Sequence, residues 1–280
     1  NDKVEVTLDN VNIKADSGSA LTSKGDVTLT LKGDNHLTGG ISDTGNYGRN
    51  GIASTGSLTI TGGENGSLTA QGGSGADGGH GGHGIYSNGS LTISGGSTVT
   101  ANGGNGGNVS GDGICSNGGV TISGGTVKAA GGDSKDGYGG DGIRSDGGVT
   151  ISGNTVNAAG GSGGKVGGYG ICSFDRVAIS GGTVTANGGD GSSGGDGIRS
   201  GDIDLSGSLE LTAKAGSPNG KALSQRGNEL DLDDIKDKLG PGAKVTVTDA
   251  NGKVIDQVSI PRPVEPEEPV IPEESSSSSD

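Results

Sequence analysis

The sequence predicts an all-β protein: a parallel β-helix (β-solenoid) of about eight rungs with three short strands per rung and a small C-terminal cap. A Gly-Ile pair recurs at intervals of 33, 29, 29, 28 and 27 residues. Each period, for example 113–140 (GICSNGGVTISGGTVKAAGGDSKDGYGG), holds three runs that alternate apolar residues with polar or small ones. Since no run can bury its apolar side alone, the copies must stack. The pairs are Gly51-Ile52, Gly84-Ile85, Gly113-Ile114, Gly142-Ile143, Gly170-Ile171 and Gly197-Ile198.

The composition fits a narrow, repetitive core. Sixty-five glycines in 280 residues would indicate low complexity if there were no period. With the period, glycine pairs separate the runs, and a Gly-rich loop leads to the next copy. One Phe, four Tyr and no Trp or Met suffice for a solenoid interior.

Stacking predicts three inward-facing columns of aliphatic side chains, one for each run. We expect successive members of a column to lie about 4.8 Å apart, the hydrogen-bonding distance between strands. The columns are Ile52/Ile85/Ile114/Ile143/Ile171/Ile198, Ile60/Ile93/Ile122/Ile151/Ile179/Leu205 and Leu68/Val99/Val127/Val156/Val184/Leu211.

The pattern divides the chain into three parts. Residues 1–227 form the β-helix, in which residues 1–19 are an irregular half-rung covering its N-terminal end. Residues 228–260 form the C-terminal cap, with a short helix and a β-hairpin that turns at Asn251-Gly252. Residues 261–280, rich in Pro, Glu and Ser, are a disordered linker, which suggests that another module or a wall anchor follows.

Charge and composition limit the partners. The net charge of −14 disfavours nucleic acids and anionic membrane surfaces, and no apolar run is long enough to span a membrane. An acidic chain rich in Gly, Thr and Ser is typical of a secreted protein. We therefore expect an extracellular location on a bacterial cell surface, as a monomeric unit of a larger multi-domain protein.

Acidic side chains at the rung entries predict a calcium site. Asp112 and Asp141 each precede a Gly-Ile pair on neighbouring rungs, so their carboxylates lie close together. With Asp133 or Asp136 and loop carbonyls they would supply the oxygen ligands that Ca²⁺ prefers. The alternative is that they are solvated turn aspartates.

The third residue of each Gly-Ile-X-Ser motif faces outward and forms a candidate ligand-binding column. It places Tyr86, Arg144 and Arg199 on one face, where Tyr can stack on sugar rings and Arg can pair with carboxylates. Ordinary surface variation is the alternative. His80 and His83, near Asp77, could bind a transition metal, although two His in a flexible glycine loop more often have no such role.

The two cysteines occupy the same outward column. Cys115 and Cys172 are two rungs apart, with Arg144 between them, so their Cα atoms would be about 9.6 Å apart. A disulfide rarely joins Cα atoms more than about 7 Å apart. We predict two free, outward-facing thiols.

The order of four motifs resembles a known family. VTLTLKGDNHLTGG (27–40), GSLTITGG (56–63), GGTVTANGG (181–189) and GDGIRS (195–200) are similar to the right-handed parallel β-helix proteins of clostridial cell surfaces, the carbohydrate-binding domain family. The resemblance covers about residues 1–227. It implies a non-catalytic, calcium-containing protein that binds pectin-type or cellulosic polysaccharide.

These observations lead to three functional hypotheses. The first is a non-enzymatic, extracellular carbohydrate-binding module for an acidic polysaccharide, assisted by calcium or by Arg144 and Arg199. The second is a structural stalk or adhesin domain whose ligand is a protein. The third is a weak or inactive β-helical polysaccharide lyase. No nucleophile with a positioned His is apparent in the sequence, which favours the non-enzymatic hypotheses.

Overall fold

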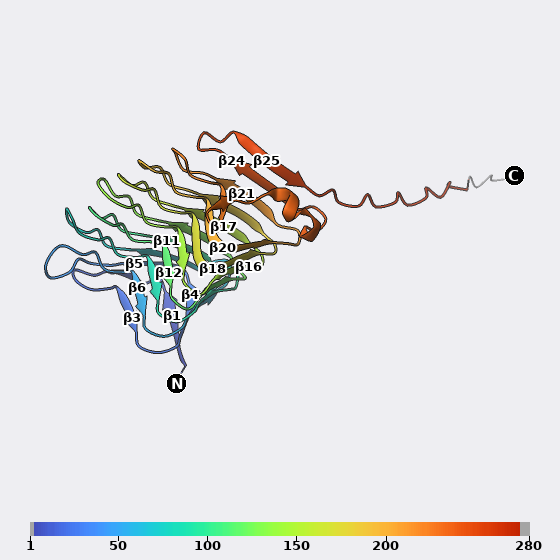
Figure 1. The fold of residues 1–280 in the computed structure, drawn as a ribbon. Helices are drawn as coiled ribbons and strands as arrows, with labels where there is room; N and C mark the ends of the chain where they lie inside the picture. The colour runs from blue at the N-terminus through green and yellow to red at the C-terminus, as the bar shows by residue number, and fades with distance from the viewer. Residues whose placement is uncertain (1–2, 275–280) are drawn as a thin grey trace.

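The computed structural model describes residues 3–274 and shows a parallel β-solenoid (Figure 1). Seven complete turns, from β3–β5 to β20–β21, stack between incomplete turns at the two ends. The expected fold class is confirmed; the sequence estimate of about eight rungs includes these partial turns. Three strands make up each of the first five complete turns, whereas β18 and β20 each run through two faces as one bent strand.

The strands form three parallel columns, one for each run of the repeat. The first column contains β3 (Leu21–Ser23), β6 (Ile52–Ser54), β9 (Ile85–Ser87), β12 (Ile114–Ser116), β15 (Ile143–Ser145), β18 (Ile171–Ile179), β20 (Ile198–Leu205) and β22 (Leu223–Gln225). The second contains β1 (Val4–Asp9), β4 (Val27–Lys32), β7 (Leu58–Gly62), β10 (Leu91–Ile93), β13 (Val120–Ile122), β16 (Val149–Ile151) and the second halves of β18 and β20. The third contains β2 (Asn12–Lys14), β5 (Asp34–Thr38), β8 (Ser67–Gln71), β11 (Thr98–Asn102), β14 (Thr126–Ala130), β17 (Thr155–Ala159), β19 (Thr183–Asn187), β21 (Glu210–Lys214) and β24 (Lys244–Thr248).

The three aliphatic columns form the core in the predicted register. Ile114 pairs with Ile85 on one side and with Ile143 on the other, and all three side chains are fully buried. The second and third columns are buried in the same way. At the N-terminal end β1 pairs with β4 as an added half-turn, and Val4 and Val6 remain exposed at its edge.

A column of buried serines lies at the corner after the first strands, and Ser87 and Ser116 bond to corner carbonyls. The Ser116 hydroxyl lies 2.9 Å from the carbonyl oxygen of Gly89 in the preceding turn and 3.0 Å from that of Gly119 in its own turn. Ser87 makes the equivalent contacts one turn earlier. At these two turns the serine of Gly-Ile-X-Ser therefore supplies an additional donor to the corner carbonyls, whereas the buried Ser145 hydroxyl has no such partner.

The Gly-rich segments form ordered arms, where the sequence suggested flexible loops. We define the Gly-rich arms as residues 72–84, 103–113, 131–142, 160–170 and 188–197; they project to the upper left in Figure 1. Within one arm the Gly140 N–H donates to Gly132 O (2.9 Å), and from the next arm Gly161 N–H donates to Gly140 O (2.8 Å). In each arm, the segment that leaves the third strand is thus hydrogen-bonded to the segment that returns to the first strand. The arm is also hydrogen-bonded to the arm of the next turn. The chain of bonds runs through Gly73, Gly82, Gly104, Gly111, Gly132, Gly140, Gly161, Gly168, Gly189, Gly195 and Gly216.

The arms require glycine because their backbones touch directly. A Cβ atom on Gly161 would lie 1.9 Å from Gly132 O, and one on Gly168 would lie 1.8 Å from Gly140 O. Such distances are far below van der Waals contact, and the obstructing atoms belong to the backbone, which cannot turn aside. The glycine positions of the arms therefore form a second packed layer, in which backbone meets backbone directly.

The C-terminal end differs in detail from the expected cap. The helical part consists of two short 3₁₀ helices, η1 (Leu232–Asp234) and η2 (Lys236–Lys238), and β23 (Asn228–Glu229) pairs antiparallel with β22. β24 continues the third column in parallel, and β25 (Val254–Ser259) covers its edge in antiparallel pairing. An antiparallel last strand ends the parallel stack and reduces the exposed edge.

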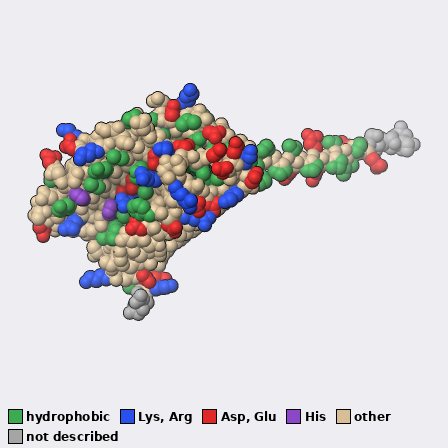
Figure 2. Space-filling model, in the orientation of Figure 1, with side chains coloured by type: hydrophobic (Ala, Val, Ile, Leu, Met, Phe, Trp, Pro, Cys, Tyr) green, Lys and Arg blue, Asp and Glu red, His purple; other side chains and the backbone are tan. Residues whose placement is uncertain are grey.

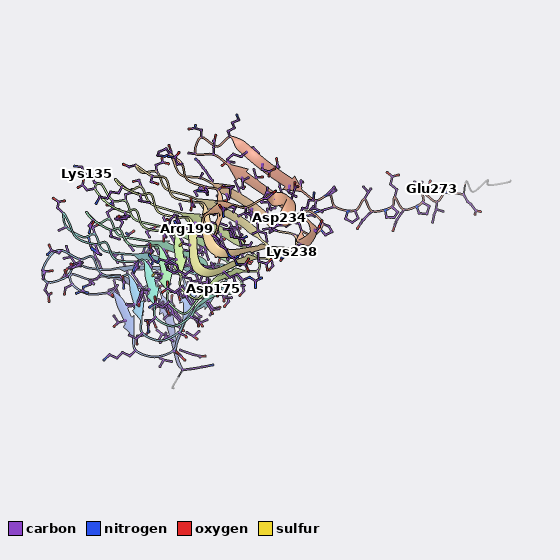
Figure 3. The ribbon with its side chains drawn as sticks, viewed as in Figure 1. Lys135, Asp175, Arg199, Asp234, Lys238 and Glu273 are labelled. Atoms are coloured by element: carbon purple, nitrogen blue, oxygen red, sulfur yellow. The ribbon has the colours of Figure 1, made fainter. Side chains whose placement is uncertain are left out.

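Ion pairs and the tail complete this end. Lys238, which Figure 3 shows at the C-terminal end of the solenoid, lies 3.5 Å from Asp204. Asp204 also pairs with Arg176, so η2 is linked to β20. Residues 261–274 contain no helix or strand and are exposed. The rest of the predicted linker, 275–280, lies outside the described residues.

Among residues 3–274, the structure has no helix that is both long and apolar enough to cross a membrane.

The direct contact between arms yields a stability prediction. Gly161→Ala should lower the free energy of unfolding by about 3 kcal/mol, the upper end of typical overpacking costs, because its methyl group would meet Gly132 O. Gly63→Ala is the matched control, since a Cβ there has no atom within 4 Å. Urea unfolding of both variants checks this. Equal stability of the two would contradict the packed-arm interpretation.

Candidate functional site

A groove runs between the first strand column and the Gly-rich arms. Its volume is about 490 Å³, and four successive turns contribute to its walls. Figure 2 shows histidine side chains on this side of the molecule beside hydrophobic and basic ones. Figure 3 shows Arg199 near the strands and Lys135 at the far tip of an arm. The lining side chains include His80, His83, Val109, Asp112, Tyr138, Asp141, Arg144, Val166 and Tyr169.

A ladder of side-chain acceptors forms the inner wall of the groove. It consists of residues that directly precede Gly-Ile pairs; Tyr169, which precedes Gly170-Ile171, is the exception, since its hydroxyl accepts from the Arg199 side chain instead. Asn50 Oδ1 accepts from His83 N–H (2.8 Å), and His83 Nδ1 accepts from Asp112 N–H (2.9 Å). Asp112 Oδ1 accepts from Asp141 N–H (2.7 Å), and Asp141 Oδ1 accepts from Tyr169 N–H (2.8 Å). Each side chain therefore satisfies a backbone donor of the next turn, which explains why acceptors recur at this position.

The ladder buries two neighbouring carboxyl groups. Asp112 and Asp141 are 6% and 7% exposed. Burial, and after it the Asp112 carboxylate, raise the pKa of Asp141 to about 8. Both effects favour the protonated form of Asp141 relative to an exposed aspartate, and its Oδ1 still accepts the N–H of Tyr169.

The donor set around these aspartates does not fit calcium. Ca²⁺ takes six to eight oxygen ligands, but Asp112 and Asp141 each use one carboxylate oxygen on the neighbouring turn. The backbone carbonyl of Asp141 accepts from Gly113 N–H, and the Arg144 guanidinium is a nearby positive charge. Too few free oxygens converge here, so we assign no role to calcium.

Asp133 and Asp136 do not join this pair, which corrects the predicted four-residue site. They line a separate pocket at the arm tips. Asp133 Oδ1 accepts from Ser162 N–H (2.8 Å), so it belongs to a second ladder that connects the tips of successive arms. The error arose because the sequence does not show how far an arm carries its tip from the strands.

The structure places the predicted ligand-binding residues in one column beside the groove. Tyr86, Arg144 and Arg199 follow one another in register, with a cysteine between each pair. Arg144 lines the groove directly, whereas Tyr86 stacks on His83, with ring centroids 5.9 Å apart. Arg199 lies over the ring of Tyr169, 5.0 Å from its centroid.

Sequence reasoning missed three aromatic residues at this site. Tyr138 and Tyr169 line the groove. The Arg144 guanidinium lies over the ring of Phe174, 5.2 Å from its centroid. Tyr138 comes from an arm, and Phe174 from an irregular part of β18, where the register shifts. The only available signal was the rarity of aromatic residues in this chain, which makes each one notable.

The cysteines are separated as predicted but differ in exposure. Arg144 lies between Cys115 and Cys172 in the strand register, and both thiols are free. Cys115 is half-buried, whereas Cys172 is only 6% exposed although it occupies the same outward-facing column. Burial raises the pKa of both thiols, that of Cys172 to about 12.

Comparisons of the chain with protein-family models, with curated proteins and with solved structures gave no match. The resemblance to the clostridial carbohydrate-binding family therefore rests on the sequence motifs and stays a prediction.

The ladder predicts a pH-dependent effect of one substitution. In Asp141→Asn the amide oxygen can still accept from Tyr169 N–H, as Asn50 does from His83. In the wild type, an unfolded Asp141 has a pKa of about 3.9. Because the folded pKa is higher, the folded chain binds the extra proton, and stability falls as pH rises from about 4 to about 8. Asp141→Asn should therefore gain stability relative to wild type across this window.

Denaturant unfolding at pH 4 to 9 measures this difference, with Asp141→Ala as the control. The alanine variant leaves Tyr169 N–H without its acceptor and should lose about 1–3 kcal/mol at every pH. A constant difference between Asp141→Asn and wild type would contradict the buried, protonated Asp141.

Thiol chemistry tests the strand register. Denatured protein should titrate with two thiol equivalents, while in the native protein Cys115 should react before the more deeply buried Cys172. Mass spectrometry after brief alkylation, with Cys115→Ser and Cys172→Ser as references, identifies the modified residue. Faster modification of Cys172 would contradict its position.

Proposed function

We propose that this protein is a non-catalytic carbohydrate-binding module that holds an acidic polysaccharide in the groove. The observation that carries the proposal is the direction of the groove: equivalent positions of four successive turns line it. A site that repeats along the stacking axis suits an extended polymer of repeating units better than a compact ligand.

The side chains of the groove support this ligand class. Tyr138 is 46% exposed and offers a ring face for stacking on sugars. Arg144 offers a guanidinium that can pair with a uronate carboxylate. Phe174 holds Arg144, and Tyr169 holds Arg199, so the cations are oriented before a ligand arrives. These cations would also offset the negative net charge of the protein at the point of contact.

The proposal assigns no catalytic role to the carboxyl groups. The ladder accounts for the positions of Asp112 and Asp141 without any reaction, since each accepts a backbone N–H of the next turn. The acidic composition, rich in Gly and Ser, supports action outside the cell, on a bacterial surface.

A glycan array followed by calorimetry tests the proposal. We expect binding to polygalacturonate and weaker binding to a neutral polysaccharide such as cellulose. Tyr138→Ala should weaken binding of either polymer about tenfold, equivalent to about 1.4 kcal/mol, whereas Arg144→Gln should weaken only binding of the uronate polymer.

Tyr47→Ala is the matched control. Tyr47 lies in the same arm column as Tyr138 and is similarly exposed (49%), but it does not line the groove. Equal losses in Tyr47→Ala and Tyr138→Ala would contradict a groove site. Absence of polysaccharide binding would reject the proposal in favour of a stalk or adhesin domain with a protein ligand.

A further inference from the structure

One corner of the groove brings together three side chains of metal-binding type. They are His83 at the entry to β9, and Asp112 and Cys115 in the next turn, at the entry to and within β12. Their nitrogen, oxygen and sulfur ligand atoms all lie within 4.8 Å of one another, and among residues 3–274 no other three His, Cys, Asp or Glu residues converge in this way. The strand register causes the convergence, because Cys115 pairs with Tyr86 one turn below.

The distances approach those of a tetrahedral site. Zn²⁺ binds His nitrogen and carboxylate oxygen at about 2.0–2.1 Å, so two such ligands lie about 3.4 Å apart across a tetrahedral edge. His83 Nδ1 and Asp112 Oδ2 are 3.5 Å apart. The Cys115 sulfur lies within 4.8 Å of both atoms and would have to move toward them to complete a third vertex at a Zn–S distance of about 2.3 Å.

The neighbours of His83 fix its ring and its tautomer. The ring stacks on Tyr86 with an interplanar angle of 19°. Its Nδ1 accepts from Asp112 N–H, so in a neutral ring the proton is on Nε2 and the Nδ1 lone pair faces the aspartate. A metal ion would take over this lone pair from the N–H, and the Cys115 thiol would lose its proton to solvent.

The charge and exposure of the corner favour a borderline-soft divalent ion. A thiolate, an imidazole and one carboxylate are ligands that Zn²⁺ accepts, and Ca²⁺ or Mg²⁺ does not use the first two. His83 and Asp112 line the groove, with their side chains 29% and 9% exposed. A metal ion bound between them would keep an open coordination position on the groove side, as zinc sites with three protein ligands do.

We propose that His83, Asp112 and Cys115 form a zinc site that opens into the groove. The site does not depend on the proposed carbohydrate function, and a groove ligand that carries a hydroxyl or carboxylate could occupy the open position. The equivalent corner one turn further has Arg144 in place of the cysteine. Cys172, one turn beyond that, has both Arg144 and Arg199 near its thiol. Neither of these corners repeats the combination of imidazole, carboxylate and thiol found at His83, Asp112 and Cys115.

Zinc titration of the full chain against a chromogenic chelator tests the proposal, with His83→Asn, Asp112→Asn, Cys115→Ser and Cys172→Ser as variants. The first two retain a ladder acceptor, as Asn50 shows, so the fold should persist. Wild type and Cys172→Ser should bind one Zn²⁺ per chain with equal affinity. His83→Asn and Cys115→Ser should bind Zn²⁺ at least about a hundredfold more weakly than wild type, because loss of even an outer-shell partner lowers metal affinity about 10–100-fold.

Cobalt substitution identifies the sulfur ligand. With Co²⁺, wild type and Cys172→Ser should show a thiolate-to-cobalt charge-transfer band that Cys115→Ser lacks. The proposal is overturned by absence of this band, by equal Zn²⁺ affinity of His83→Asn and wild type, or by a loss in Cys172→Ser as large as in Cys115→Ser. Thermal unfolding without metal confirms that each variant is folded before its affinity is compared.

Discussion

Direct contact between peptide backbones in the Gly-rich arms is the constraint on which the rest of this structure depends. The arms connect the third strand of each turn to the first strand of the next, so their geometry sets how the turns stack. Their close approach leaves no room for a Cβ atom, since a Cβ on Gly161 would lie only 1.9 Å from Gly132 O. In return, the arm N–H groups find carbonyl partners within the arm and in the next turn. Glycine is thus used here for packing, and the arms form one wall of a groove.

The second organising feature is a hydrogen bond from a backbone N–H to a side chain of the preceding turn, which is repeated along the stack with different side chains. Asn50, His83, Asp112 and Asp141 each lie at the entry to a first strand, and each accepts a backbone N–H of the next turn. The backbone N–H that needs an acceptor is the same at each of these turns, but the side chains that accept it differ in what else they can bind. An imidazole beside a carboxylate can bind a metal ion, and burial raises the pKa of a second carboxyl group, that of Asp141.

Function therefore depends on where the repeat varies. The inward columns vary little, since a narrow core accepts only Ile, Val, Leu and Ala. The groove-facing positions carry Tyr, His, Asp and Arg in an otherwise Gly-, Thr- and Ser-rich chain. The aromatic rings of Phe174 and Tyr169 orient the guanidinium groups of Arg144 and Arg199, so the scaffold fixes the direction of these side chains as well as their positions.

The sequence by itself determined the fold class, the register and the core. The Gly-Ile period and the two-residue alternation place Ile114 between Ile85 and Ile143, because strand pairing in a solenoid copies the repeat. The same register separated Cys115 from Cys172 and put Tyr86, Arg144 and Arg199 on one face. Only the tertiary structure decided the path of the arms, because it depends on backbone hydrogen bonds between residues many positions apart. That path carries Asp133 away from Asp141, brings Tyr138 and Tyr169 to the groove, and leaves His83, Asp112 and Cys115 in one corner that no local pattern in the sequence marks.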